Sequence, residues 1–147
     1  MILKRILIAV VALVLMMQFF RIDKRNPIAE PSEDFINRVK PDAEITALLK
    51  SACYDCHSYT TEYPWYSDIA PVSWWLKHHI NEGREELNFS AWGSYTERKA
   101  EHKLEECAEL VEEGEMPLSS YTWTHKDAKL TAIQKEKLAG FFNSLRK

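Results

Sequence analysis

The residues most able to do chemistry in this sequence form one short run, Cys53-Tyr54-Asp55-Cys56-His57. Its pattern, C-x-x-C-H, is the attachment signature of a c-type haem. Two thiols one helical turn apart can each form a thioether bond with a vinyl group of the same porphyrin. The residue that follows can offer an imidazole nitrogen as the proximal ligand of the iron. The motif therefore predicts one covalently attached haem c, with Cys53 and Cys56 as attachment points and His57 as iron ligand.

The iron position opposite His57 needs a second ligand, and the identity of that ligand separates electron carriers from catalysts and sensors. Met116 is the leading candidate. It follows a predicted helix end, and Pro117 next to it would stiffen the loop that presents the thioether. His79 is the alternative, through coordination of the iron by two imidazoles.

A third cysteine and a reading without haem also have to be considered. Cys107 falls on the apolar face of a predicted helix, where a small buried side chain is the simplest interpretation. Without haem, Cys53, Cys56 and His57 could bind zinc together with Cys107 or His102, or the cysteine pair could form a thiol-disulfide centre. The paired spacing of zinc sites is absent, however, and redox C-x-x-C motifs normally lie in a βαβ context that this sequence lacks.

The elements that must position these residues are predicted to be helices. A helix starting near Asp42 carries an apolar stripe that runs directly into the cysteine motif. Further helices are expected from Pro71 to about Leu87, from a capping box at Ser94 to Gly114, and from a capping box at Thr131 to the C-terminus. In the last of these, Gly140 suggests close approach of another helix. Because no strand alternation is found, the fold class is predicted to be all-α: a small cytochrome c-like helical domain around one haem.

The N-terminal segment has the pattern of an export signal or a transmembrane anchor. Residues 6–20 are apolar except for Gln18, and basic residues flank them on both sides. No A-x-A-like cleavage site follows, which favours an uncleaved anchor. The predicted organisation is a membrane anchor or signal segment over residues 1–25, a tether over 26–41 and a haem-binding domain over 42–147.

Composition and charge restrict the partners. Five Trp, six Tyr and six Phe suit a flat buried ligand, although they also suit an ordinary core. After residue 25 the chain has 14 basic and 21 acidic side chains, a formal net charge of −7. Nucleic acid is disfavoured as a partner, because phosphate binding requires a basic face. Redox partner proteins with a basic docking patch would suit this charge.

The sequence resembles the bacterial haem-binding domain family of small exported c-type cytochromes and, more distantly, class I cytochromes c. Besides the C-x-x-C-H motif, the resemblance is carried by Tyr63-Pro64-Trp65-Tyr66 to Trp75, His78 to Trp92, Gly114-Glu115-Met116-Pro117-Leu118 and His125 to Thr131. It implies covalent haem at Cys53 and Cys56 with axial His57 and Met116. It does not identify a redox partner.

These features together predict a monohaem electron-transfer cytochrome rather than an enzyme. Since c-type maturation attaches haem outside the bacterial cytosol, the haem domain is expected in the periplasm, with a single-pass anchor in the cytoplasmic membrane. The alternative is a haem-based enzyme or a gas or redox sensor, in which the sixth iron position is open to a peroxide or a diatomic gas.

Overall fold

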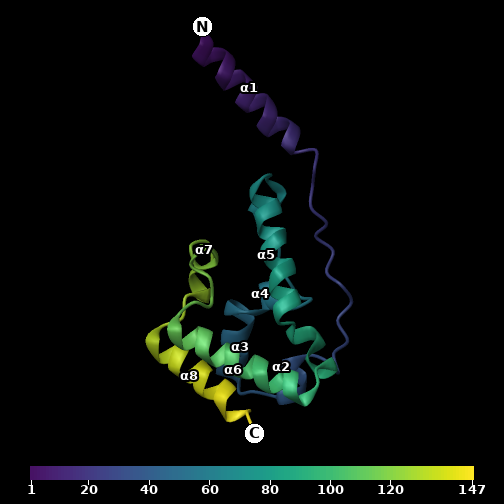
Figure 1. The fold of residues 1–147 in the computed structure, drawn as a ribbon, viewed down its shortest axis with the longest axis vertical. Helices are drawn as coiled ribbons and strands as arrows, with labels where there is room; N and C mark the ends of the chain where they lie inside the picture. The colour runs from purple at the N-terminus through teal and green to yellow at the C-terminus, as the bar shows by residue number, and fades with distance from the viewer.

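The computed structural model describes residues 1–147 and consists of helices joined by loops, which confirms the all-α prediction (Figure 1). In chain order the α-helices are α1 (Ile2–Met17), α2 (Phe35–Val39), α3 (Ala43–Ala52), α4 (Tyr54–His57), α5 (Val72–Glu86), α6 (Glu97–Glu113), α7 (Ser119–Thr122) and α8 (Ala132–Ser144). Three short 3₁₀ helices lie between them: η1 (Trp65–Asp68), η2 (Phe89–Ser94) and η3 (Lys126–Ala128).

Helix α3 forms as predicted and delivers the cysteine motif. Its N-cap is Asp42, whose carboxylate accepts a hydrogen bond from the backbone N–H of Ile45 at 2.8 Å. Its apolar stripe is buried in the main core, to which α6 and α8 contribute their own buried faces. The members of the α3 stripe are Ile45, Leu48, Leu49 and Ala52. Because α3 ends at Ala52, the motif begins where this buried face ends.

Helices α6 and α8 lie side by side along the opposite wall of the core (Figure 1). Helix α8 begins with the predicted capping box between Thr131 and Gln134, and α6 ends at Gly114 with a φ of 79°. Two expectations are wrong. The N-cap of α6 is Thr96, while the Ser94 hydroxyl donates to the carbonyl of Ala91 within η2. A Cβ on Gly140 would have no atom within 4 Å, so this glycine serves no helix contact.

The stretch predicted as a tether contributes to the core. Within residues 26–41 lies α2, capped by Asp34, and its first residue Phe35 is completely buried. The ring of Phe35 packs 5.0 Å from that of Phe89 and 4.8 Å from that of Trp92, measured between centroids. Burying such a side chain contributes about 1.5–3 kcal/mol to stability. The packed core thus starts at residue 35, earlier than the predicted boundary at 42.

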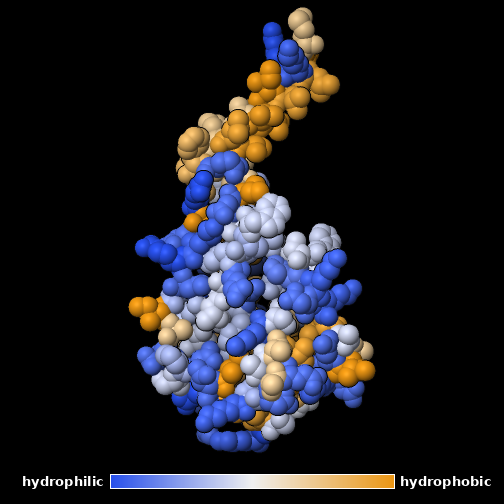
Figure 2. Space-filling view, turned by 180° about the vertical axis from the view of Figure 1, so that it is seen from behind, coloured by the Kyte–Doolittle hydropathy of each residue, from blue (hydrophilic) through white to orange (hydrophobic).

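Helix α1 extends away from the rest of the molecule and contains no buried residue (Figure 1). On the face seen in Figure 2 the largest continuous hydrophobic surface covers α1, whereas the helical domain shows mostly hydrophilic side chains with smaller hydrophobic patches. Judged by length and hydropathy, none of the helices meets the requirements of a membrane span. The chain after α1 runs back along α5 and is fixed there by an ion pair of Lys24 with Asp68 at 2.7 Å and a hydrogen bond from Asn26 to the Thr61 carbonyl at 2.9 Å.

Candidate functional site

An apolar cavity of about 210 Å³ lies where α3 and α4 meet α6. Cys53 and His57 of the motif line it, together with Met116 from the loop after α6 and Cys107 from α6 itself. Most of the other lining residues are apolar, and three charged residues complete the wall: Ala52, Leu87, Phe89, Leu110, Val111 and Phe142, with Glu86, Lys103 and Glu106. The structure therefore brings the predicted distal ligand and two of the three motif residues to one space.

The second motif cysteine lies on a different cavity. Cys56 lines a small neighbouring space of about 10 Å³ between α4, α5 and the loop that contains α7. Leu76 and Ile80 of α5 form one side of this space, and Tyr121 and His125 form another. The two thiols thus point into two adjacent spaces, and the chain segment after α6 borders both of them.

The imidazole of His57 is oriented by backbone groups. Its Nδ1 atom lies 2.8 Å from the carbonyl oxygen of Gly83 and 3.1 Å from that of Leu87. Since both neighbours are acceptors, Nδ1 carries the proton and Nε2 keeps a free lone pair. Burial lowers the pKa of His57, which keeps the ring neutral at pH 7. A neutral imidazole whose other nitrogen donates to a carbonyl is the usual state of a histidine metal ligand.

Gly83 allows α4 to rest directly on α5. A Cβ at this position would lie only 2.9 Å from the carbonyl oxygen of Cys56 and 3.3 Å from its Cβ. Any other residue would push the two helices apart and move the carbonyl that His57 uses. A glycine inside a helix lowers helix stability by about 1 kcal/mol relative to alanine. A glycine within a predicted helix therefore indicates, from sequence alone, a close contact of this kind.

Arg84, the next residue of α5, fixes the loop that follows His57. Its Nε donates to the Ser58 carbonyl at 2.7 Å, and its Nη2 donates to the Thr61 hydroxyl at 2.8 Å and to the Asn26 side-chain oxygen at 2.9 Å. The guanidinium also lies 5.5 Å from the ring centroid of Tyr59. One side chain therefore joins α5, the motif loop and the segment that leads to α1. Sequence reasoning assigned no role to either Gly83 or Arg84.

The alternative distal ligand does not share this cavity. His79 packs its ring against Trp75, with ring centroids 4.3 Å apart, and its Nδ1 lies 2.9 Å from the Trp75 carbonyl oxygen. It is absent from the lining of the space that contains His57. Met116 rather than His79 shares a cavity with His57.

The protonation state of the motif thiols differs from that of redox-active cysteine pairs. Burial raises the pKa of Cys53 to about 12 and that of Cys56 to about 11, so both are protonated thiols at neutral pH. Redox-active C-x-x-C pairs have a lowered thiol pKa instead. No three His, Cys, Asp or Glu side chains lie together as a metal-binding group.

The chemical types of the residues suit an iron porphyrin: two thiols, an imidazole with a free nitrogen, a thioether and apolar walls. The cavity volume of about 210 Å³ is smaller than the roughly 300 Å³ of the smallest typical ligand sites. The walls must therefore move apart to admit a porphyrin. The segment after α6 can supply this movement, because Met116 borders one space and Tyr121 the other. Helix α7 within this segment has no buried residue.

The chain matches a known protein family. Residues 12–144 match a family model described as a haem-binding domain. The matched range includes the cysteine motif, the lining of both cavities and Met116. No curated protein and no solved structure matches the chain.

Proposed function

The chain belongs to the haem-binding domain family, and from this membership we propose that it is a monohaem c-type cytochrome that transfers electrons. In this proposal Cys53 and Cys56 form the two thioether bonds, His57 is the proximal iron ligand and Met116 the distal one. The observation that carries the proposal is the shared cavity, in which Met116 lies beside His57 while the Nδ1 proton of His57 is held by two backbone carbonyls.

The bound haem would supply a one-electron iron couple, and the residues around it would set the properties of that couple. The apolar walls exclude water from the ligands, which favours the less charged, reduced state. The hydrogen bonds of Nδ1 hold the imidazole in one orientation, so that Nε2 stays available in both oxidation states. A thioether opposite His57 raises the reduction potential further.

We also propose the location predicted from the sequence. Attachment to the cytoplasmic membrane is supported by the apolar helix α1, which has no buried residue, and by basic residues in its first turns and after its end. Covalent attachment of haem would place the domain outside the cytosol, where it would exchange electrons with partner proteins.

Intact mass measurement tests the proposal directly. The full chain is expressed with a c-type maturation system, denatured and weighed. We expect an adduct of one haem that survives denaturation, and we expect Cys53→Ser combined with Cys56→Ser to abolish it. Cys107→Ser is the matched control and should keep the adduct, because Cys107 lines the cavity without belonging to the motif. A wild-type polypeptide without covalent haem would exclude the proposed function.

A further inference from the structure

One end of the helical domain exposes large apolar and aromatic side chains. Ile69, Val72, Trp74 and Trp75, at and just before the first turn of α5, are 44%, 43%, 36% and 46% exposed. We call these four residues the tryptophan end. Clustered exposed apolar residues of this size mark an interaction surface. The chemistry around them indicates which partner they meet.

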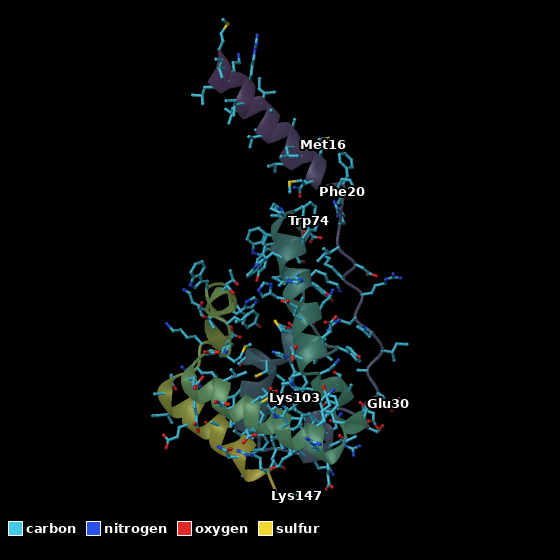
Figure 3. The ribbon with its side chains drawn as sticks, in the orientation of Figure 1. Met16, Phe20, Glu30, Trp74, Lys103 and Lys147 are labelled. Carbon is cyan, nitrogen blue, oxygen red and sulfur yellow. The ribbon has the colours of Figure 1, made fainter.

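The tryptophan end is continuous with the exposed surface of α1. The side-chain amide of Gln18 pairs with the backbone of Ala70 in both directions, donating to its carbonyl and accepting from its N–H, each at 3.0 Å. The indole N–H of Trp74 donates to the carbonyl of Phe20 at 2.7 Å. Figure 3 shows Trp74 next to Phe20, close to Met16 in the last turn of α1. Any apolar medium that surrounds the end of α1 therefore also reaches Trp74.

The charges at this end are basic, unlike those of the rest of the domain. Arg21 and Lys77 have no carboxylate within ion-pair distance, whereas Lys24 and Arg25 are paired with Asp68 and Asp23. After residue 25 the chain as a whole has a net charge of −7. Each basic side chain near an anionic lipid surface contributes about 1 kcal/mol to binding, and Trp prefers the headgroup level of a bilayer. The tryptophan end thus matches a lipid surface in both polarity and charge.

The connection between α1 and the domain is short and fixed rather than loose. The ion pair of Lys24 with Asp68 and the hydrogen bonds of Asn26 with Thr61 and Arg84 hold the chain against the domain directly after α1. The domain is thereby restrained from turning its tryptophan end away from the surface that contains α1.

We propose that the tryptophan end lies in the headgroup layer of the anionic bilayer that holds α1, so that the folded domain itself contacts the membrane in one orientation. This inference rests on the proposed membrane attachment through α1. It adds a contact made by α5 and fixes which end of the domain faces the lipid.

The test uses the full-length, haem-loaded protein, labelled with 5-fluorotryptophan and inserted into nanodiscs of zwitterionic and anionic phospholipid. Fluorine NMR signals are assigned from single Trp→Phe variants and compared with and without a lipid that carries gadolinium on its headgroup. We expect Trp74 and Trp75 to lose several-fold more intensity than Trp92. Trp92 is the internal control, because it packs against Phe35 beyond the far end of α5, a helix of about 22 Å by its 15 residues.

The result can separate this inference from the attachment on which it rests. If the protein co-elutes with nanodiscs but Trp74 and Trp75 broaden no more than Trp92, the contact is refuted and the attachment stands. If the protein fails to co-elute with nanodiscs, the attachment itself fails and the contact with it. If both signals resist the gadolinium lipid and also a soluble gadolinium chelate, a second copy or another protein covers this end, which likewise overturns the lipid contact.

Discussion

His57 obtains its orientation from backbone carbonyls of α5 and not from an acidic side chain. The two acceptors, on Gly83 and Leu87, are one turn apart near the end of the helix. Substitution of neighbouring side chains leaves such acceptors in place, whereas a displacement of the α5 backbone removes them. The position of α5 relative to α4 therefore controls the orientation of the His57 imidazole.

Gly83→Ala should show this control. The added Cβ would lie 2.9 Å from the Cys56 carbonyl, and such overpacking costs about 1–3 kcal/mol. We expect the free energy of unfolding in urea to fall by that amount and the reduction potential to shift as His57 loses its acceptors. Gly140→Ala is the matched control. It also lies inside a helix but has no neighbour within 4 Å, so it should raise stability by about 0.5–1 kcal/mol. Equal effects of the two variants would contradict this account.

The distal ligand is tested by Met116→Ala. Loss of the thioether should abolish the Met–iron absorption band and lower the reduction potential by on the order of 0.1 V, within the roughly 0.8 V over which axial ligands act. His79→Ala should leave both unchanged, because His79 packs on Trp75 away from the cavity. The opposite pattern would make His79 the ligand. Rapid binding of carbon monoxide by the reduced wild-type protein, without a Met–iron band, would favour a sensor or enzyme.

The sequence predicts individual residues whose side-chain type and spacing alone indicate their chemistry. It misses residues whose role depends on a contact made in the folded protein. Cys53, Cys56 and His57 stand out through spacing alone. The partnership of His57 with Gly83 joins residues 26 positions apart, and no periodic pattern encodes it. Arg84 likewise gains its role only when Ser58, Thr61 and Asn26 meet around it.

Among the elements after residue 34, the segment from Gly114 to His125 contains no buried residue. It borders both cavities, and α7 within it has no buried residue. Its main polar contact is the hydroxyl of Tyr121, which donates to Asp55 at 2.7 Å. Segments with few buried contacts open most readily.

Amide hydrogen exchange should locate this opening. We expect the haem-free double variant of Cys53 and Cys56 to exchange fastest, among its helical regions after residue 34, between residues 115 and 125. In the haem-loaded protein the same amides should become at least tenfold more protected, because Met116 would be tied to iron. Helix α3, with its fully packed stripe, is the internal control and should change little. Uniform protection changes across the domain would count against a local opening.

Helices long enough to show an apolar stripe were predictable from the sequence, whereas the short helix α2 was not. The helices α3, α5, α6 and α8 were expected from apolar spacing and capping patterns, and all four are present. Helix α2 has five residues, too few to display a period, and the burial of Phe35 depends on aromatic rings that lie more than 50 residues later. The cap at Thr96 was missed because the η2 turn uses Ser94 first.

Across the whole molecule, the acidic residues lie on the domain and the basic excess lies around α1. Such a field accelerates encounter with cationic partners and slows encounter with anionic ones, and salt screens both effects. Small cationic reagents should therefore also react faster than anionic ones.

Electron transfer to charged reagents should reveal this field. Oxidation of the reduced protein by a cationic cobalt(III) phenanthroline complex should slow several-fold between low and high ionic strength, whereas oxidation by ferricyanide should accelerate. Replacing the exposed acids Glu109 and Glu112 of α6 with Lys should flatten both dependences. Salt dependences of the same sign for both reagents would show that charge does not govern access.

Helix α5 sets the distance between the tryptophan end and the residues that orient His57. Trp74 lies at the end that we assign to the bilayer. The carbonyls that hold His57 lie nine and thirteen residues further along the chain, at Gly83 within α5 and at its C-cap Leu87. With a rise of 1.5 Å per residue, this spacing is about 14 to 20 Å along the helix axis. If α5 stands upright, the redox centre is held at that height above the headgroups. Only partners that present their own centre at a matching height could then exchange electrons with it while both stay on the membrane.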